Sequence, residues 1–190
     1  MKINFKEIKT SSNLLSLFRL LLAIPLWFLL DNFKSDTARY ATFFVCILGS
    51  VTDIMDGYLA RKFNQVTEMG KIIDPLADKV VIGAIIIKLF LIGQISATYF
   101  SLIIGRDVLI FIGGIIVTKF VGRVLPSNIL GKITVVNIGL VILLILLNVN
   151  QNILIFKGFY YLSVLLIFVS FSAYAYRALE FIKKKDYGNI

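Results

Sequence analysis

Residues 52–79 read TDIMDGYLARKFNQVTEMGKIIDPLADK and place four aspartates inside or beside long apolar runs. The four are Asp53, Asp56, Asp74 and Asp78. A carboxylate in hydrocarbon is costly unless a partner offsets its charge. Hard divalent cations such as Mg²⁺ or Mn²⁺ are the partners that oxygen ligands suit best. The stretch therefore predicts a metal-dependent site in a membrane-embedded chain.

The composition around this stretch is that of a membrane protein. Of 190 residues, 58% are hydrophobic and only 16% are charged, and the mean hydropathy is +0.89. A soluble domain of this size cannot hide so much apolar surface, whereas a bilayer can. The chain has no histidine, which excludes a histidine-based relay and a histidine-ligated metal. Its one cysteine, Cys46, excludes an internal disulfide.

Six apolar stretches are each close to the roughly 20 residues that a spanning helix needs. They have no alternating pattern, which favours helices over a membrane barrel. The sequence thus predicts an all-α polytopic membrane protein with six transmembrane helices, forming a single domain over residues 1–190. Residues 1–12 precede the first span, either as a short helix on the membrane surface or as a frayed basic tail. The six stretches are roughly 13–31, 37–61, 70–93, 98–121, 129–149 and 153–180.

The distribution of cations predicts the orientation. If the N-terminus is cytoplasmic, thirteen Lys and Arg residues flank the spans on that side, against Lys34, Arg39 and Lys157 on the other. This is a strong positive-inside bias. We expect a protein of a bacterial-type inner membrane with both termini and the aspartates on the cytoplasmic side. The net charge of +9 then serves topology and contact with anionic lipid, not nucleic-acid binding.

The spacing of the aspartates predicts that they meet. Asp53 and Asp56 share one helix face, and Asp74 and Asp78, four residues apart, share another. The short link 62–69 turns the two helices antiparallel, so both carboxylate faces can meet across one interface.

Two other interpretations of the aspartates stay open. They could form structural ion pairs with nearby cations, or line the path of a cation transporter. A transport path should cross the bilayer, whereas these residues cluster near one surface, which favours a reaction site. The cations available for structural pairs are Arg19, Lys79, Lys88 and Arg106.

The motif resembles the signature of the CDP-alcohol phosphatidyltransferases, with every fixed position present. The pattern is D-x-x-D-G-x-x-A-R, eight residues, then G-x-x-x-D-x-x-x-D. The string NLLSLFR, with Asn13 and Arg19, also resembles the family at the start of its first span. The resemblance implies transfer of a phosphatidyl group from CDP-diacylglycerol to an alcohol acceptor with release of CMP, and a possible homodimer. The fixed residues are Asp53, Asp56, Gly57, Ala60, Arg61, Gly70, Asp74 and Asp78.

The resemblance also implies a role for each of these residues. The four aspartates would bind two divalent ions, Mg²⁺ or Mn²⁺, and Asp78 would also act as general base on the acceptor hydroxyl. In a chain without histidine a carboxylate is the natural base. Arg61 would contact the donor phosphates, and the three small residues Gly57, Ala60 and Gly70 would leave room for the cytidine.

The acceptor is expected to be a small anionic alcohol bound by cations in the cytoplasmic half. The candidates are Arg106, Arg123 and Lys132. Each also has a structural interpretation: an ion pair with Asp107 for Arg106, and a topology-setting charge for the other two. We expect Asp107, one residue on, to point elsewhere on the helix, so that Arg106 needs another anion.

Glycerol-3-phosphate is the favoured acceptor, although two local departures weaken it. Phosphatidylglycerophosphate synthases often carry a second Arg further along the fourth helix and a GKxKT string. Here those positions are Gly113, Gly114 and the string GKIT at 131–134. The strings GRDV and PSNILGKIT also resemble cardiolipin synthases of the transferase type, which use phosphatidylglycerol. The alternatives are phosphatidylglycerol or an inositol compound as acceptor and, in another class, a cation transporter or non-catalytic scaffold.

Overall fold

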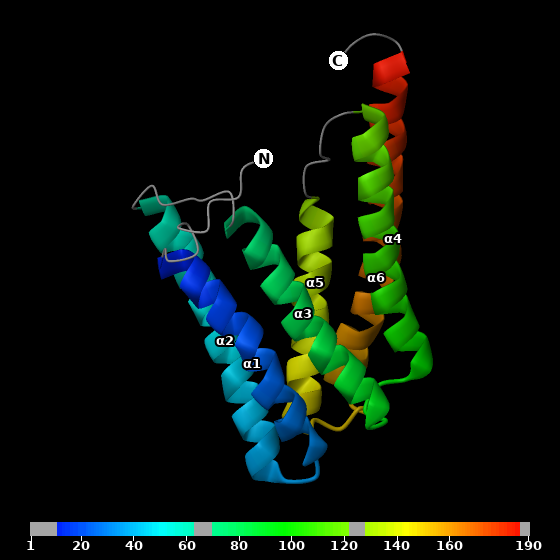
Figure 1. Ribbon diagram of the computed structural model, residues 1–190. Helices are drawn as coiled ribbons and strands as arrows, with labels where there is room; N and C mark the ends of the chain where they lie inside the picture. Colours follow the sequence, from blue (N-terminus) through cyan, green and yellow to red (C-terminus); the bar gives the residue numbers. More distant parts are fainter. Residues whose placement is uncertain (1–10, 63–69, 122–127, 187–190) are drawn as a thin grey trace. The chain divides into compact units, whose positions relative to one another are not determined.

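The computed structural model describes residues 11–62, 70–121 and 128–186. Side chains are described over a narrower part, namely 14–55, Tyr58, 77–120 and 128–183. Every regular element in these ranges is a helix, which confirms the all-α prediction. The helices, drawn in chain order in Figure 1, are α1 (Ser11–Asp31), α2 (Asp36–Lys62), α3 (Gly70–Leu91), α4 (Ala97–Val121), α5 (Ile129–Leu146) and α6 (Leu154–Asp186).

The helix bounds follow the predicted apolar stretches closely, except at the end of α6. That helix continues to Asp186, beyond the apolar run, through RALEFIKKKD. Most of these residues are good helix formers, so the helix needs no apolar environment to continue. The predicted surface segment lies mostly in residues 1–10, outside the described residues.

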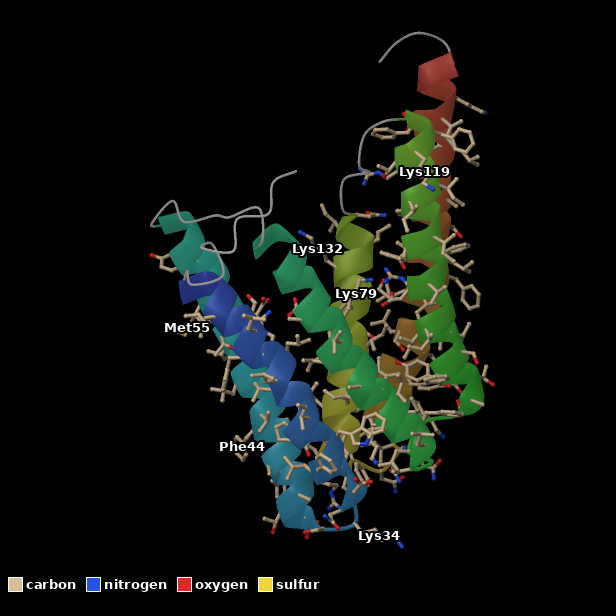
Figure 2. The ribbon with its side chains drawn as sticks, viewed as in Figure 1. Lys34, Phe44, Met55, Lys79, Lys119 and Lys132 are labelled. Carbon is tan, nitrogen blue, oxygen red and sulfur yellow. The ribbon has the colours of Figure 1, made fainter. Side chains whose placement is uncertain are left out.

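In the part of the chain whose side chains are described, five helices are long and apolar enough to cross a membrane. That part of α3 begins only at Ala77, and the helix carries Asp74, Asp78, Lys79 and Lys88 among its apolar residues. Many of the helices' large apolar side chains are exposed, such as Phe44 and Met55 on α2 (Figure 2). Exposed apolar surface on helices of this length is what lipid contact requires. The chain is therefore a polytopic, all-helical membrane protein.

The chain divides into two compact units, Met1–Gln94 and Ile95–Ile190. In the first unit, α1 packs against both α2 and α3. Figure 1 shows α1 lying along both of these helices. The core holds Leu26 and Leu30 of α1 with Ile86 and Leu89 of α3, all almost fully buried. This arrangement puts α1 in contact with both helices that carry the aspartates. The single domain over 1–190 stays a prediction.

In the second unit, α6 packs against both α4 and α5. Two contacts between α4 and α6, Tyr99 with Ser163 and Arg106 with Ser170, each join residues 64 apart. A constant offset means that α4 and α6 run in the same direction. Thr134 of α5 donates to the carbonyl of Leu166 at 3.2 Å. Such interhelical hydrogen bonds are typical of polar side chains inside a membrane bundle.

Candidate active site

Two of the four aspartates meet at one arginine of α1. Nη1 of Arg19 lies 2.7 Å from Oδ1 of Asp53 and 2.5 Å from Oδ1 of Asp78. The Arg19 side chain is only 4% exposed, whereas the two carboxylates are partly exposed. Because one nitrogen binds both oxygens, the carboxylates of α2 and α3 lie close together, as the spacing predicts.

A third helix takes part in this meeting. The spacing predicts that the carboxylate faces of α2 and α3 can meet across one interface, and it says nothing of α1. In the described residues, each of these helices packs mainly on α1, and the cation from α1 stands between the carboxylates. The physical reason is charge: two carboxylates in a low-dielectric setting repel each other, and a buried guanidinium between them offsets that repulsion.

The remaining residues of the motif have their backbone in the same two helices. Asp56, Gly57, Ala60 and Arg61 lie in the last turns of α2, and Gly70 and Asp74 in the first turns of α3. Their side chains fall outside the described part. Within that part no group of three or more metal-ligating side chains occurs, and it includes only two of the four aspartates. Asp53 and Asp78 nevertheless fit a divalent cation, because hard oxygen ligands from two helices already converge on one positive charge.

The cations considered as structural partners behave differently from one another. Arg19 does bind the motif, so an ion pair is present there. Lys88, at the other end of α3, binds Asp31 of α1 and lies 4.7 Å from the centre of the Trp27 ring. Lys79 is exposed. Among the side chains that the structure describes, the first unit thus holds two buried cations, one that binds two carboxylates of the motif and one that binds a carboxylate outside it.

Arg106 is buried in the second unit, where α4, α5 and α6 come together. Its Nη1 lies 2.6 Å from Oδ1 of Asp107, and its Nη2 lies 3.4 Å from Oγ of Ser170. A Cβ atom placed on Gly131 would stand 3.1 Å from Nη2. Nε is buried and has no hydrogen-bond partner among the described residues. The guanidinium is therefore held on one side, while the hydrogen bonding of its Nε–Nη2 edge in the described part of the chain is limited to the long contact with Ser170.

The expectation that Asp107 points away from Arg106 was wrong. Their Cβ atoms do diverge on the helix, but the long arginine side chain lets the guanidinium turn back to its neighbour. The nearest carboxylate is the least costly counter-ion for a cation in a membrane span.

The other acceptor candidates lie near the start of α5 or before it. Asn128 caps α5 by accepting a hydrogen bond from the backbone N–H of Leu130 at 3.1 Å. Gly131 and the exposed Lys132 follow in the first turns. Because Gly131 lies beside Arg106, α5 begins at the level of Arg106, and about 22 Å of α4 continues beyond that level. Figure 2 shows Lys119 on that continuation, beyond Lys132. Arg123 lies outside the described residues.

Gly113 and Gly114 have a packing role. A Cβ on Gly113 would stand 3.4 Å from Cε1 of Tyr174, and one on Gly114 would stand 3.0 Å from its hydroxyl oxygen. The ring of α6 thus lies against the two glycines of α4, where larger side chains would not fit without a shift. An arginine at either glycine would therefore have to share its space with this tyrosine ring.

Comparison with known proteins agrees with the motif. A model of the CDP-alcohol phosphatidyltransferase family matches residues 9–172. The chain belongs to this family. The match extends from the start of α1 well into α6, and so includes both units.

Three relatives in the family have informative names. A protein of Aquifex aeolicus (strain VF5), named CDP-diacylglycerol–glycerol-3-phosphate 3-phosphatidyltransferase, is 36% identical over 181 residues, covering 91% of this chain and 98% of the relative. A Bacillus subtilis (strain 168) protein of the same name is 41% identical over 96 residues, or 50% of this chain and 49% of the relative. A cardiolipin synthase (CMP-forming)/mitochondrial hydrolase fusion protein of Schizosaccharomyces pombe is 40% identical over 105 residues, or 55% of this chain and 17% of the relative.

Sequence reasoning about this family member overlooked the bridging position of Arg19. The sequence identifies Arg19 as a cation at the start of the first span and as one of several candidate ion-pair partners of the aspartates. A cation in the first span, facing two spans rich in aspartate, is the available signal. The contact of Gly131 with Arg106 had no signal in the sequence, because it joins α5 to α4 through a side chain of unknown direction.

Proposed function

We propose that the chain transfers the phosphatidyl group of CDP-diacylglycerol to glycerol-3-phosphate and releases CMP. The observation that carries the proposal is the convergence of Asp53 and Asp78, from different helices of the family motif, on one guanidinium. The Aquifex relative, matched over nearly its whole length, supports glycerol-3-phosphate as the acceptor. An anionic donor at a membrane surface agrees with the strongly basic composition.

The reaction is an exchange at the phosphorus that carries the diacylglycerol. The acceptor hydroxyl oxygen forms a bond to this phosphorus, and the phosphorus–oxygen bond to CMP breaks. The hydroxyl proton passes to a carboxylate, for which we propose Asp78, and CMP leaves with the bridging oxygen. Arg61 would bind the donor phosphates, and Gly57, Ala60 and Gly70 would leave space for the cytidine.

We propose that Asp53, Asp56, Asp74 and Asp78 hold divalent ions, two Mg²⁺ or Mn²⁺. When bound, these ions neutralise the pyrophosphate and stabilise the charge on the leaving CMP. The chain's own contribution is to bring carboxylates from two helices close together. The contacts of Arg19 with Asp53 and Asp78 support this.

The phosphate of the acceptor would bind at Arg106, with Lys132 and Arg123 as further cations. The support is geometric: Nη1 of Arg106 is bound by Asp107, Nη2 lies beside Gly131, and Nε is buried with no hydrogen-bond partner among the described residues. The Nε–Nη2 edge of a guanidinium suits two oxygens of a phosphate. The cytoplasmic orientation of the site and of both termini, and a homodimer, belong to the same proposal.

Phosphatidylglycerol is the second candidate acceptor. The cardiolipin synthase relative and the GRDV and GKIT strings favour it. Its phosphate is a diester with a single negative charge, and the Arg106–Asp107 pair would suit it better than an unpaired cation would. The inositol compound, the cation transporter and the scaffold have no comparable support.

The test is CMP release by the purified protein in detergent micelles with CDP-diacylglycerol and Mg²⁺ or Mn²⁺. Glycerol-3-phosphate, phosphatidylglycerol and inositol phosphate are supplied separately, and the lipid product is identified by mass. We expect CMP and phosphatidylglycerophosphate with glycerol-3-phosphate. Release with phosphatidylglycerol alone would replace the proposed acceptor, and no release with any alcohol would refute the proposed chemistry.

A further inference from the structure

The two buried cations that the structure describes in the first unit have different carboxylate partners. Lys88 binds one carboxylate, that of Asp31, and lies against the Trp27 ring. Arg19 binds two, those of Asp53 and Asp78, through a single nitrogen. A single guanidinium nitrogen thus contacts carboxylates from two helices at once, whereas the ammonium of Lys88 contacts the carboxylate of Asp31.

The guanidinium of Arg19 is buried, while the two carboxylates that it contacts are partly exposed. The Arg19 side chain is 4% exposed, and its two partners come from different helices. Without the guanidinium, the carboxylates of Asp53 and Asp78 would repel each other across the space between α2 and α3. Arg19 therefore stabilises the arrangement of carboxylates when no other cation is there.

We propose that Arg19 is a positioning residue that serves as the internal counter-cation of the metal-free site and competes with divalent ions for Asp53 and Asp78. The inference rests on the proposed function, because it takes these aspartates to be metal ligands. A bound metal and the guanidinium seek the same oxygens, so each weakens the binding of the other, as any two linked cations must. Arg19 thus keeps the site assembled while lowering its affinity for metal.

The test measures metal binding to the full-length protein in detergent, without lipid substrates. Mn²⁺ affinity is determined by electron paramagnetic resonance of the free ion, and Tm is measured in EDTA and in excess Mn²⁺. Arg19→Gln removes the charge and keeps N–H donors, whereas Arg19→Lys keeps the charge. Lys88→Gln is the matched control, because it removes the other buried cation that the structure describes in the same unit.

For Arg19→Gln we expect a Tm lowered in EDTA, a larger rise of Tm on adding Mn²⁺ than in the wild type, and a Kd for Mn²⁺ lower by about 5-fold or more. Arg19→Lys should stay close to the wild-type Kd. Lys88→Gln should lower Tm equally with and without Mn²⁺ and leave the Kd unchanged.

The outcomes separate this inference from the proposed function. If the wild-type protein binds no Mn²⁺, the proposed metal site itself fails. If the wild type binds Mn²⁺ and the Kd of Arg19→Gln is unchanged or higher, only the role of Arg19 is refuted. If Arg19→Gln cannot be purified without metal, purification in Mn²⁺ followed by removal with EDTA measures the same loss of stability, and a Tm in EDTA equal to the wild type's would overturn the proposal.

Discussion

Comparing the single variants Asp53→Asn and Asp31→Asn would distinguish a reaction site from a structural ion pair. Both aspartates bind a buried cation of the first unit, Arg19 and Lys88 respectively. Their side chains are similarly exposed, 44% for Asp53 and 51% for Asp31. Each substitution removes one negative charge at nearly constant volume. If the motif were only structural, the activity of each variant should fall only as far as its stability does.

The contacts predict that Asp31→Asn loses more stability and that Asp53→Asn loses more activity. Asp53→Asn leaves Arg19 bound to Asp78 at 2.5 Å, so the loss should stay within the range of a partly exposed ion pair, about 1 kcal/mol or less. Asp31→Asn removes the carboxylate of Lys88 and leaves it against the Trp27 ring, which should cost about 1–3 kcal/mol. Activity should fall by about 100-fold or more for Asp53→Asn, as for other key electrostatic groups.

The assay is kcat/KM for CDP-diacylglycerol from CMP release, measured beside Tm in the same detergent. We expect Asp31→Asn to keep kcat/KM within about threefold of wild type at a temperature where both variants are folded. Near-wild-type turnover of Asp53→Asn, or losses of activity in both variants that follow their Tm values, would refute the reasoning and favour the structural ion pair.

Three further outcomes follow from the second unit and the topology. Arg106→Ala should raise the KM for the acceptor, or lower its kcat/KM, by about 10- to 150-fold, with little change in CDP-diacylglycerol binding. Gly131→Ala, which crowds the same guanidinium, should change the same acceptor parameters by about 3- to 10-fold. Equal losses for the donor would indicate a structural role. Gly114→Ala should lower Tm more than Gly113→Ala, because only the former brings a Cβ to 3.0 Å from a tyrosine hydroxyl; a larger loss for Gly113→Ala would contradict this packing. In a cysteine-free background, Lys119→Cys should react with an impermeant thiol reagent only from the cytoplasmic side, and a matched cysteine in the α1–α2 connection only from outside; the reverse pattern would invert the topology.

The helices could be predicted from the sequence because one physical requirement dominates them. Backbone groups in lipid must form their hydrogen bonds within the segment, so an apolar run of sufficient length is a helix almost regardless of its residues. This requirement does not apply outside lipid, so the end of α6 could not be predicted from it. The helix continues to Asp186 through a largely polar segment. The aspartate faces could be predicted for a similar reason, since helix geometry alone sets which residues share a side.

The partners of the buried charges could not be predicted in the same way. Spacing shows that Asp53 and Asp78 lie on faces that can meet, but not that a third helix supplies the cation between them. That depends on how α1 packs, which nearly uniform apolar surfaces leave unspecified in the sequence. For Arg106, helix geometry predicted the wrong partner. The guanidinium binds Asp107, its neighbour in sequence, because a long, flexible side chain need not follow the direction of its Cβ atom.

The two buried arginines have different partners, which fits them for different roles. Arg19 receives carboxylates from two other helices, so its charge is committed to assembling the motif. Arg106 takes a carboxylate from its own helix by one nitrogen, and its Nε has no hydrogen-bond partner in the described residues. A cation neutralised locally and on one side can stay in the membrane without a ligand and still bind a phosphate on its other edge. On this argument Asp107 is a counter-ion that stabilises the buried charge of Arg106 when no acceptor is bound. Arg19 does the same for the aspartates when no metal is bound.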